Sequence, residues 1–244
     1  WVYQNEEFNE LEKEHVFLPS WQIVCHVSEV SRAGDYVAFE FFGQRGFVIR
    51  DEAGTLRAFH NVCAHRAHAV VAGERGSCEK FLRCNYHGWL MDEAGRVIEQ
   101  PYDDVVNPGR GKRCTTKAYP VKECAGLLFA YMGPQPVPEL PVWEPFTWEN
   151  GFREVVISHI PCNWFQCQEN SCDPVHFEWM HANWSRRLRG APAGDEGGYA
   201  PAHVQLAFED FEHGLIYKRI TEDTDANHPL WTIGRVCLWP NGFF

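Results

Sequence analysis

Residues 63–68 read Cys-Ala-His-Arg-Ala-His, and residues 84–89 read Cys-Asn-Tyr-His-Gly-Trp. Each stretch offers one thiol and one imidazole at close spacing, and eighteen residues separate His65 from Cys84. Glycines at 73, 76 and 88 allow tight turns around both stretches. Two short loops at the tips of β-hairpins would therefore bring four metal-binding side chains together from two sides.

The four donors match the ligands of a Rieske-type [2Fe–2S] cluster, in which two thiolates bind one iron and two imidazoles bind the other. A Cys2His2 zinc site needs the same ligand types, but its usual gap is roughly two to four residues and no finger helix follows here. Replacing His65 by His68, or Cys84 by Cys78, gives no matched pair of loops. Four unrelated core residues are the remaining alternative. The pattern favours a [2Fe–2S] cluster held by Cys63, His65, Cys84 and His87.

The sequence around these loops predicts antiparallel β-structure. Residues 6–18 have a helical pattern that Pro19 ends. From Trp21 to Tyr131, short apolar runs alternate with turn signals, which indicates a meander of antiparallel strands closed by residues 126–132. Residues 133–141 contain four prolines and read as a linker. These features predict an N-terminal helical segment (1–18), a cluster-binding domain (19–137) and a second domain (138–244).

The second domain shows a mixture of helix and strand signals. Residues 153–160 read as a strand, and residues 163–181 read as a helix interrupted near Pro174. A polar loop rich in Gly and Pro follows at 189–201. Three more strands are expected within 203–211, 214–223 and 230–239. The whole chain is therefore expected to be α+β and mostly antiparallel β.

A second metal-binding pattern lies in the interrupted helix, where Asp173, His176 and His181 follow one another as D-x2-H-x4-H. Two histidines and one carboxylate bind the iron of non-haem oxygenases. On an ideal helix, positions five apart are rotated by about 140°, so a regular helix would not direct both histidines to one metal. A break at Pro174 or a π-bulge is needed. A buried polar network is the alternative interpretation.

Residues 63–101 resemble the Rieske domain of ring-hydroxylating oxygenases, whose second loop usually reads C-P-Y-H-G-W, with Asn85 here in place of that proline. Residues 163–181 resemble the mononuclear-iron motif of the α subunits of that family, especially its phthalate-dioxygenase-like branch. The resemblance covers essentially the whole chain. It implies a Rieske β domain followed by an incomplete helix-grip catalytic domain.

The resemblance also implies roles for single residues. His176 and His181 would bind a mononuclear Fe(II), and Asn170 would lie near that iron. Asp173 would carry electrons from a cluster histidine of the neighbouring subunit, which by position is His87. The third iron ligand of the family is a carboxylate far along the chain, expected beyond Phe244, so we expect this sequence to be an inactive fragment of a longer protein.

The family's chemistry implies a terminal oxygenase component. A reductase or ferredoxin would pass NAD(P)H-derived electrons to the cluster, and O2 would be used at the iron to hydroxylate or O/N-dealkylate an organic, typically aromatic, substrate. The implied assembly is a homotrimer, with or without small β subunits. The alternative is a Rieske electron-transfer protein without oxygenase activity of its own.

The composition of the sequence restricts the cellular location and the classes of binding partner that we expect. A net charge of −11 argues against nucleic acid or an anionic membrane surface as the partner. No apolar run reaches the roughly 18 residues of a membrane span. The ten cysteines are scattered through a well-cored sequence, which favours reduced thiols and a cytoplasmic location. The Rieske loops also lack the extra cysteine pair of respiratory Rieske proteins, which predicts a low cluster potential.

Overall fold

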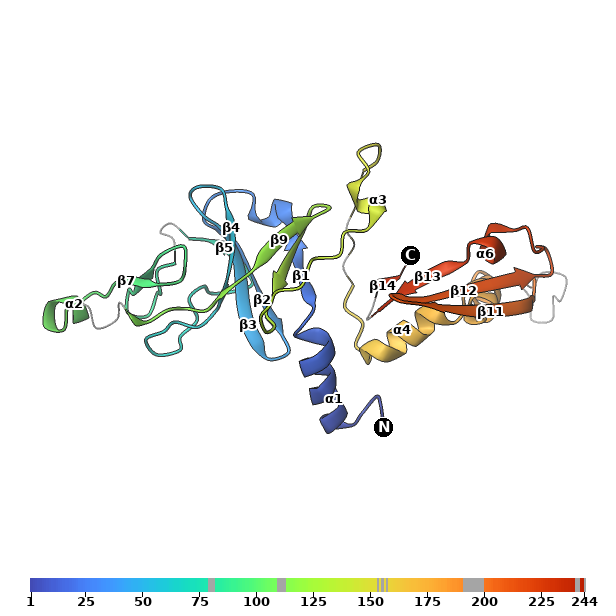
Figure 1. The fold of residues 1–244 in the computed structure, drawn as a ribbon, viewed down its shortest axis with the longest axis horizontal. Coiled ribbons are helices and arrows are strands. Elements are labelled where there is room, and N and C mark those ends of the chain that lie inside the picture. The colour runs from blue at the N-terminus through green and yellow to red at the C-terminus, as the bar shows by residue number, and fades with distance from the viewer. Residues whose placement is uncertain are drawn as a thin grey trace. The chain divides into compact units, whose positions relative to one another are not determined.

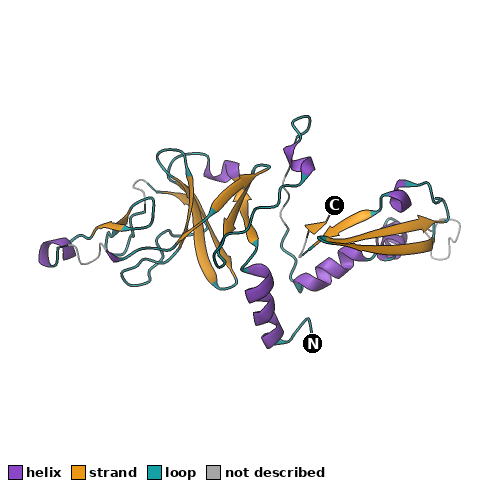
Figure 2. Cartoon of the chain, in the orientation of Figure 1, coloured by secondary structure: helices purple, strands orange, loops and turns teal. Residues whose placement is uncertain are grey.

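The computed structural model describes residues 1–78, 82–108, 113–152, 154, 156, 158–190, 200–239 and 242–243. The chain divides into two compact units (Figure 1). The first unit is Glu6–Ile157, and the second unit joins Trp1–Asn5 to Ser158–Phe244. Both combine antiparallel strands with a few helices (Figure 2), which confirms the α+β, mostly antiparallel fold expected from the sequence.

The first unit begins with helix α1 (Glu6–Glu12), which continues as the short π-helix η1 (Lys13–Phe17) before Pro19. Its larger sheet has the strand order β5-β2-β3-β4-β8. The strands β2, β3 and β4 pair consecutively, as the meander predicted. The bounds are β2 Asp35–Phe41, β3 Gln44–Arg50, β4 Leu56–His60, β5 Arg75–Ser77 and β8 Ala118–Tyr119.

A second sheet of the first unit has the order β1-β10-β9, from β1 (Trp21–His26), β10 (Leu127–Tyr131) and β9 (Val121–Cys124). The strand at 126–132 is confirmed. The meander prediction is wrong for β1, which pairs with β10 in the register Trp21↔Tyr131 rather than with the strand that follows it. Local turn signals report chain reversals, and they carry no information on a pairing across a hundred residues.

The larger sheet buries both of its faces, because successive side chains of a strand point to opposite sides. Phe47 and Ile49 of β3 belong to one apolar cluster, and Val48 between them belongs to the other. The first cluster also contains Cys63, Cys84 and the aromatic ring of Trp89. The two candidate cluster loops are therefore rooted in the core of the first unit.

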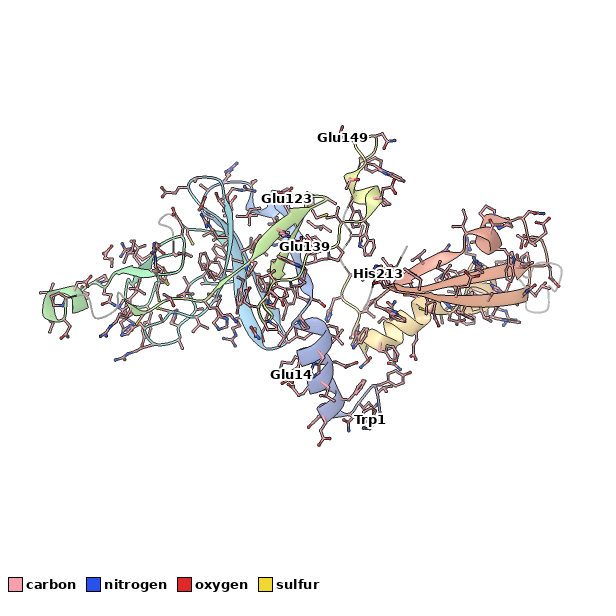
Figure 3. The ribbon with its side chains drawn as sticks, in the orientation of Figure 1. Trp1, Glu14, Glu123, Glu139, Glu149 and His213 are labelled. Carbon is pink, nitrogen blue, oxygen red and sulfur yellow. The ribbon has the colours of Figure 1, made fainter. Side chains whose placement is uncertain are left out.

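Smaller elements complete the first unit. A hairpin of β6 and β7 follows the second cluster loop, and three short helices lie in the connections. Their bounds are β6 Leu90–Met91, β7 Val97–Glu99, the 3-10 helix η2 Val27–Val30, α2 Asp103–Val106 and α3 Glu144–Thr147. Acidic side chains such as Glu14, Glu123 and Glu149 lie exposed at the surface (Figure 3), in keeping with the negative net charge.

The second unit places helices beside a four-stranded antiparallel sheet of order β11-β12-β13-β14. The predicted interruption of the helix is confirmed, because α4 ends at Cys172 and the π-helix η4 starts at Phe177. The bounds are α4 Trp164–Cys172, η4 Phe177–Trp184, α5 Ser185–Leu188, β11 His203–Phe211, β12 Gly214–Thr221, α6 Pro229–Thr232, β13 Arg235–Leu238 and β14 Gly242–Phe243.

Two strand predictions for the second unit need correction. Residues 154, 156 and 158–160 form no strand, and the remainder of the predicted strand at 153–160 lies outside the described residues. Residues 229–232 form helix α6, so the last predicted strand begins only at Arg235. The cause is local, since Pro229 occupies the first turn and the His228 side chain accepts a hydrogen bond from the Leu230 N–H. Most of the polar loop predicted at 189–201 lies outside the described residues.

None of the described helices is both long enough and apolar enough to cross a bilayer.

Candidate functional site

The first cluster loop is a tight turn that holds Cys63 at its base. The Cys63 N–H donates to the His68 carbonyl at 2.8 Å, and the Ala67 N–H donates back to the Cys63 carbonyl at 3.0 Å. Ala67 adopts a positive φ of 56°, which lets the chain reverse within five residues. The turn places Cys63 in the core, where the residue is 2% exposed.

The second loop repeats the same hydrogen-bond pattern around Cys84. The Cys84 N–H donates to the Trp89 carbonyl at 2.9 Å, and the Gly88 N–H donates to the Cys84 carbonyl at 2.9 Å. Gly88 has a φ of 73°, and a side chain at that position would approach Pro101 to 3.1 Å. A glycine is therefore required by both the conformation and the close approach.

The two loops bring the predicted ligands together in like pairs. The ring centres of His65 and His87 are 4.5 Å apart with an interplanar angle of 74°. The thiols of Cys63 and Cys84 are both buried and adjoin each other. Burial raises the pKa of the Cys63 thiol to about 11. The Cys63 thiol therefore stays protonated at neutral pH unless a bound metal displaces its proton.

This pairing fits a [2Fe–2S] cluster better than a single ion. In the described part of the chain, no three His, Cys, Asp or Glu side chains are grouped as ligands of one metal ion. A Rieske cluster instead takes two sulfur ligands on one iron and two nitrogen ligands on the other. The separate thiol pair and imidazole pair supply that donor set, and the pairing supports Cys63, His65, Cys84 and His87 as its ligands.

The two cluster histidines have different surroundings. The ring of His65 stacks on buried Trp89, with ring centres 4.6 Å apart and an interplanar angle of 9°. His87 instead contacts Tyr86 at 3.9 Å between ring centres, and Tyr86 is 56% exposed. The His65 side of the site is thus covered by the protein, whereas the His87 side adjoins an exposed aromatic ring.

Asn61 is a structural residue of this site that the sequence interpretation missed. Its buried side-chain oxygen accepts from the N–H groups of Val70 and Val71, at 2.8 and 3.0 Å, and its side-chain nitrogen donates to the Val71 carbonyl at 3.1 Å. These bonds join the start of the first loop to the chain that leaves it. An asparagine two residues before a ligand cysteine was the only available signal.

The second candidate metal site lies where α4 meets η4. Asn163 caps α4 by accepting from the Phe165 N–H at 2.9 Å, and Asp173, which follows the last residue of the helix, has extended backbone angles. One oxygen of Asp173 accepts from the Val175 N–H at 2.8 Å. Buried Pro174 lies within this turn. The chain then enters η4 with His176 as its first flanking residue.

The π-helix brings the two predicted iron ligands together. A π-helix bonds residues five apart, so His176 and His181 fall on nearly the same side, and their ring centres are 5.1 Å apart. The Nδ1 atom of His176 is buried and makes no hydrogen bond within the described residues, although it lies 3.4 Å from a carboxylate oxygen of Asp173. Two convergent imidazoles can supply two of the ligands of a non-haem iron that binds two histidines and one carboxylate. Asn170 is exposed in the last turn of α4.

The sheet of the second unit contributes residues that the sequence interpretation also missed. Glu178 of η4 accepts two hydrogen bonds from His203 of β11, and the side-chain bond lowers the pKa of the Glu178 carboxyl. Arg219 of β12 and Arg235 of β13 lie over the ring of Phe177, which itself stacks on His181. No local pattern marks these residues, because they meet only when distant strands pair.

Comparison with known proteins agrees with this site. Residues 20–120 match the model of the Rieske [2Fe-2S] domain. Over 204 residues the chain is 52% identical to the 5,5′-dehydrodivanillate O-demethylase oxygenase subunit of a Sphingobium species, covering 83% of this chain and 47% of that protein. It is 34% identical over 191 residues to the phthalate 4,5-dioxygenase oxygenase subunit of Pseudomonas putida, covering 75% and 42%. The chain thus spans about half the length of the curated relatives it matches.

Solved structures give the same result for the fold. Naphthalene 1,2-dioxygenase with indole bound matches with a TM-score of 0.68 and 25% identity, covering 88% of this chain and 52% of the other. The quaternary ammonium Rieske monooxygenase CntA matches with a TM-score of 0.67 and 21% identity, covering 100% and 65%. The paired thiols and imidazoles of the first unit agree with these relatives. The chain therefore belongs to the family of Rieske oxygenase subunits.

Proposed function

We propose that the complete protein is a terminal oxygenase component that removes the O-methyl group of an aromatic methyl ether. The observation that carries this proposal is the His176–His181 pair on η4, with Asp173 beside it. An electron-transfer protein has no use for a second pair of convergent imidazoles. The alternative function, a Rieske electron carrier whose second unit only docks a partner, leaves this pair without a role.

The proposed function needs two metal sites, and the chain supplies ligands for both. Cys63, His65, Cys84 and His87 would hold the [2Fe–2S] cluster, and His176 with His181 would hold the mononuclear Fe(II). A carboxylate expected beyond Phe244 would complete the iron's ligands. Bound iron of this type supplies the activation of O2 that inserts oxygen into the substrate. The chain's own contribution is to orient the imidazoles, through the turn at Pro174 and the hydrogen bonds of η4.

The electron path follows from the same residues. The proposed route leaves the cluster at His87 of the partner subunit and enters at Asp173, whose second oxygen lies 3.4 Å from the His176 Nδ1 atom. Two observations support it: the exposed setting of Tyr86 beside His87, and the rigid turn that fixes Asp173. This route implies a homotrimer, with or without β subunits, reduced by a reductase or ferredoxin that draws on NAD(P)H. We also propose a cytoplasmic location, supported by the scattered cysteines of the sequence.

The substrate class rests on the relative that is 52% identical, an O-demethylase named for 5,5′-dehydrodivanillate. The proposed reaction consumes ArOCH3, O2, two electrons and two protons, and yields ArOH, formaldehyde and water. Oxygen enters the methyl C–H bond, and the resulting hemiacetal breaks its C–O bond to release formaldehyde. Hydroxylation and N-dealkylation are the other outcomes that the family's chemistry would allow.

The test is a coupled turnover assay. The complete protein, loaded with iron and supplied with a reductase, NADH and O2, should release one formaldehyde for each 5,5′-dehydrodivanillate methyl group lost. The phenol product should appear in equal amount. A cluster that is reduced and reoxidised while no methyl ether, in this or related aromatic acids, is consumed would favour the electron-carrier function instead.

A further inference from the structure

Two arginines occupy one face of the second unit's sheet beside the candidate iron ligands. Tyr217 of β12 is directly opposite Arg235 of β13 in the register of the two strands. Arg219 is two residues beyond Tyr217, so its side chain leaves the sheet on the same face. The guanidinium carbons of Arg219 and Arg235 lie 5.3 and 5.6 Å from the centre of the Phe177 ring. Two cations therefore converge on one aromatic ring of η4.

That ring leads directly to the candidate iron site. The ring centres of Phe177 and His181 are 4.8 Å apart, with an interplanar angle of 23°. Both guanidinium groups and the His181 imidazole thus contact the same ring. A ligand of the size of a substituted benzoate could therefore reach both the arginines and the histidine pair.

The Arg219 guanidinium is held in place by a relay of hydrogen bonds. Glu178 accepts from the backbone N–H of His203 at 3.1 Å and from its Nδ1 at 3.0 Å. With the proton on Nδ1, the Nε2 atom of His203 is the acceptor that lies 3.5 Å from an Nη atom of Arg219. The relay is well buried, since the side chains of Glu178 and His203 are 12% and 7% exposed. The Glu178 carboxylate therefore pairs with His203 rather than with Arg219.

This arrangement leaves one donor of Arg219 unused. Arg219 is half-buried, and its Nε atom is buried without a hydrogen-bond acceptor among the described residues. The cation–π contact with Phe177 offsets part of the cost of removing the guanidinium from water. A buried cation ordinarily needs an anionic partner as well. Guanidinium groups bind carboxylates with two parallel hydrogen bonds, and an Nε with an Nη supplies such a pair of donors.

We propose that Arg219 and Arg235 form a subsite for the carboxylate of an aromatic acid, which holds the substrate ring toward His176 and His181. The inference rests on the proposed O-demethylase function and names the part of the substrate that the chain recognises. Glu178 and His203 are positioning residues in it, since they orient Arg219 without touching the ligand.

The test measures binding apart from turnover. The complete, iron-loaded protein is titrated anaerobically in a calorimeter with 5,5′-dehydrodivanillate and, separately, with its uncharged dimethyl ester. Losing one charged hydrogen-bonding group should weaken binding of the acid by about 10-fold to 100-fold. Arg219→Gln and Arg235→Gln should each show this loss for the acid and little change for the ester. Arg219→Lys should recover part of the affinity, and Arg189→Gln, which alters an exposed arginine of the same unit, should bind like the unaltered protein.

The affinities for the acid and the ester decide whether the carboxylate subsite exists. Equal affinities of the unaltered protein and both glutamine variants for the acid would overturn the subsite. So would equal weakening for acid and ester in both variants with their iron content intact, because that pattern indicates general damage to the pocket. If Arg219→Gln loses iron, the same comparison of acid and ester affinity is made with Arg235→Gln and Arg219→Lys instead. Failure of the proposed function is separate: the acid would bind through the arginines, and no formaldehyde would form under turnover conditions.

Discussion

The imidazole rings of His176 and His181 lie 5.1 Å apart between centres, although five positions separate them along a helix. A regular α-helix would rotate the second ring by about 140° away from the first. The π-helix η4 removes this mismatch because its hydrogen bonds join residues five apart. The spacing of the two histidines and the irregular helix that carries them are therefore parts of one feature.

Asp173 should matter for electron transfer and little for metal binding. Its first oxygen fixes the turn by accepting from the Val175 N–H, a bond that an amide oxygen can also accept. Asp173→Asn in the complete protein should keep both metals and lower turnover by about 10-fold to 100-fold, because the carboxylate bridge is lost. Iron analysis, the visible spectrum and turnover would be measured together. Asp210→Asn, an exposed carboxylate of the same unit, is the control, and unchanged turnover in Asp173→Asn would contradict the proposed route.

Asn61 should be essential for retaining the cluster. Asn61→Ala leaves two N–H groups and one carbonyl of buried residues without their partner, at a cost of about 1–3 kcal/mol for each unsatisfied group. The cluster absorbance should then be lost at a distinctly lower denaturant concentration. Asn107→Ala, at an exposed position, should behave like the unaltered protein. A variant at Asn61 with unaltered cluster stability would show that the first loop does not need this anchor.

Asp92 provides a pH-dependent contribution to the stability of the first unit. Burial acts to raise the pKa of its carboxyl, but the hydrogen bonds from the Arg96 N–H, the Arg96 guanidinium and the Ala94 N–H outweigh burial and lower it. A lowered pKa stabilises the folded state above the unfolded value of about 4, and this stabilisation is lost as the pH falls through the folded pKa.

Asp92→Asn should therefore reduce the free energy of unfolding at pH 7, by about 1 kcal/mol, since the ion pair with Arg96 is partly exposed. The difference between the variant and the unaltered protein should shrink as the pH is lowered below 4. Denaturant unfolding at pH 7, 5 and 3 would measure it. A difference that stays constant across this range would contradict the assigned role of the ionised carboxylate.

The cluster should have a potential toward the low end of the Rieske range, which runs from about −150 to +300 mV. Ala67 or His68 and Tyr86 occupy the places where respiratory Rieske proteins carry their extra cysteines. A spectroscopic redox titration of the complete protein should give a value below zero. A potential above about +200 mV would show that some other feature of these loops raises it.

The parts of the structure that the sequence predicted are those with local signals. The two cluster loops were predicted from closely spaced Cys and His residues. The strands β2, β3 and β4 were predicted from turn signals between apolar runs. The helix break was predicted because Pro174 lies beside two histidines at an unsuitable α-helical spacing. In each case a few neighbouring residues carry the whole argument.

The missed parts depend on distant partners. The pairing of β1 with β10 and the relay from Glu178 through His203 to Arg219 each join residues far apart in the chain. A strand pattern shows that a residue faces one side of a sheet, and it does not show what lies across from it. Asn61 escaped notice for a related reason, since an asparagine near a loop has many equally ordinary roles.

Metal analysis of the complete protein distinguishes an oxygenase from an electron carrier. We predict one iron per chain beyond the two of the cluster, and we predict that His176→Ala loses that iron while the visible Rieske spectrum stays unchanged. An iron content of two per chain both before and after the substitution would contradict the oxygenase account and leave an electron carrier.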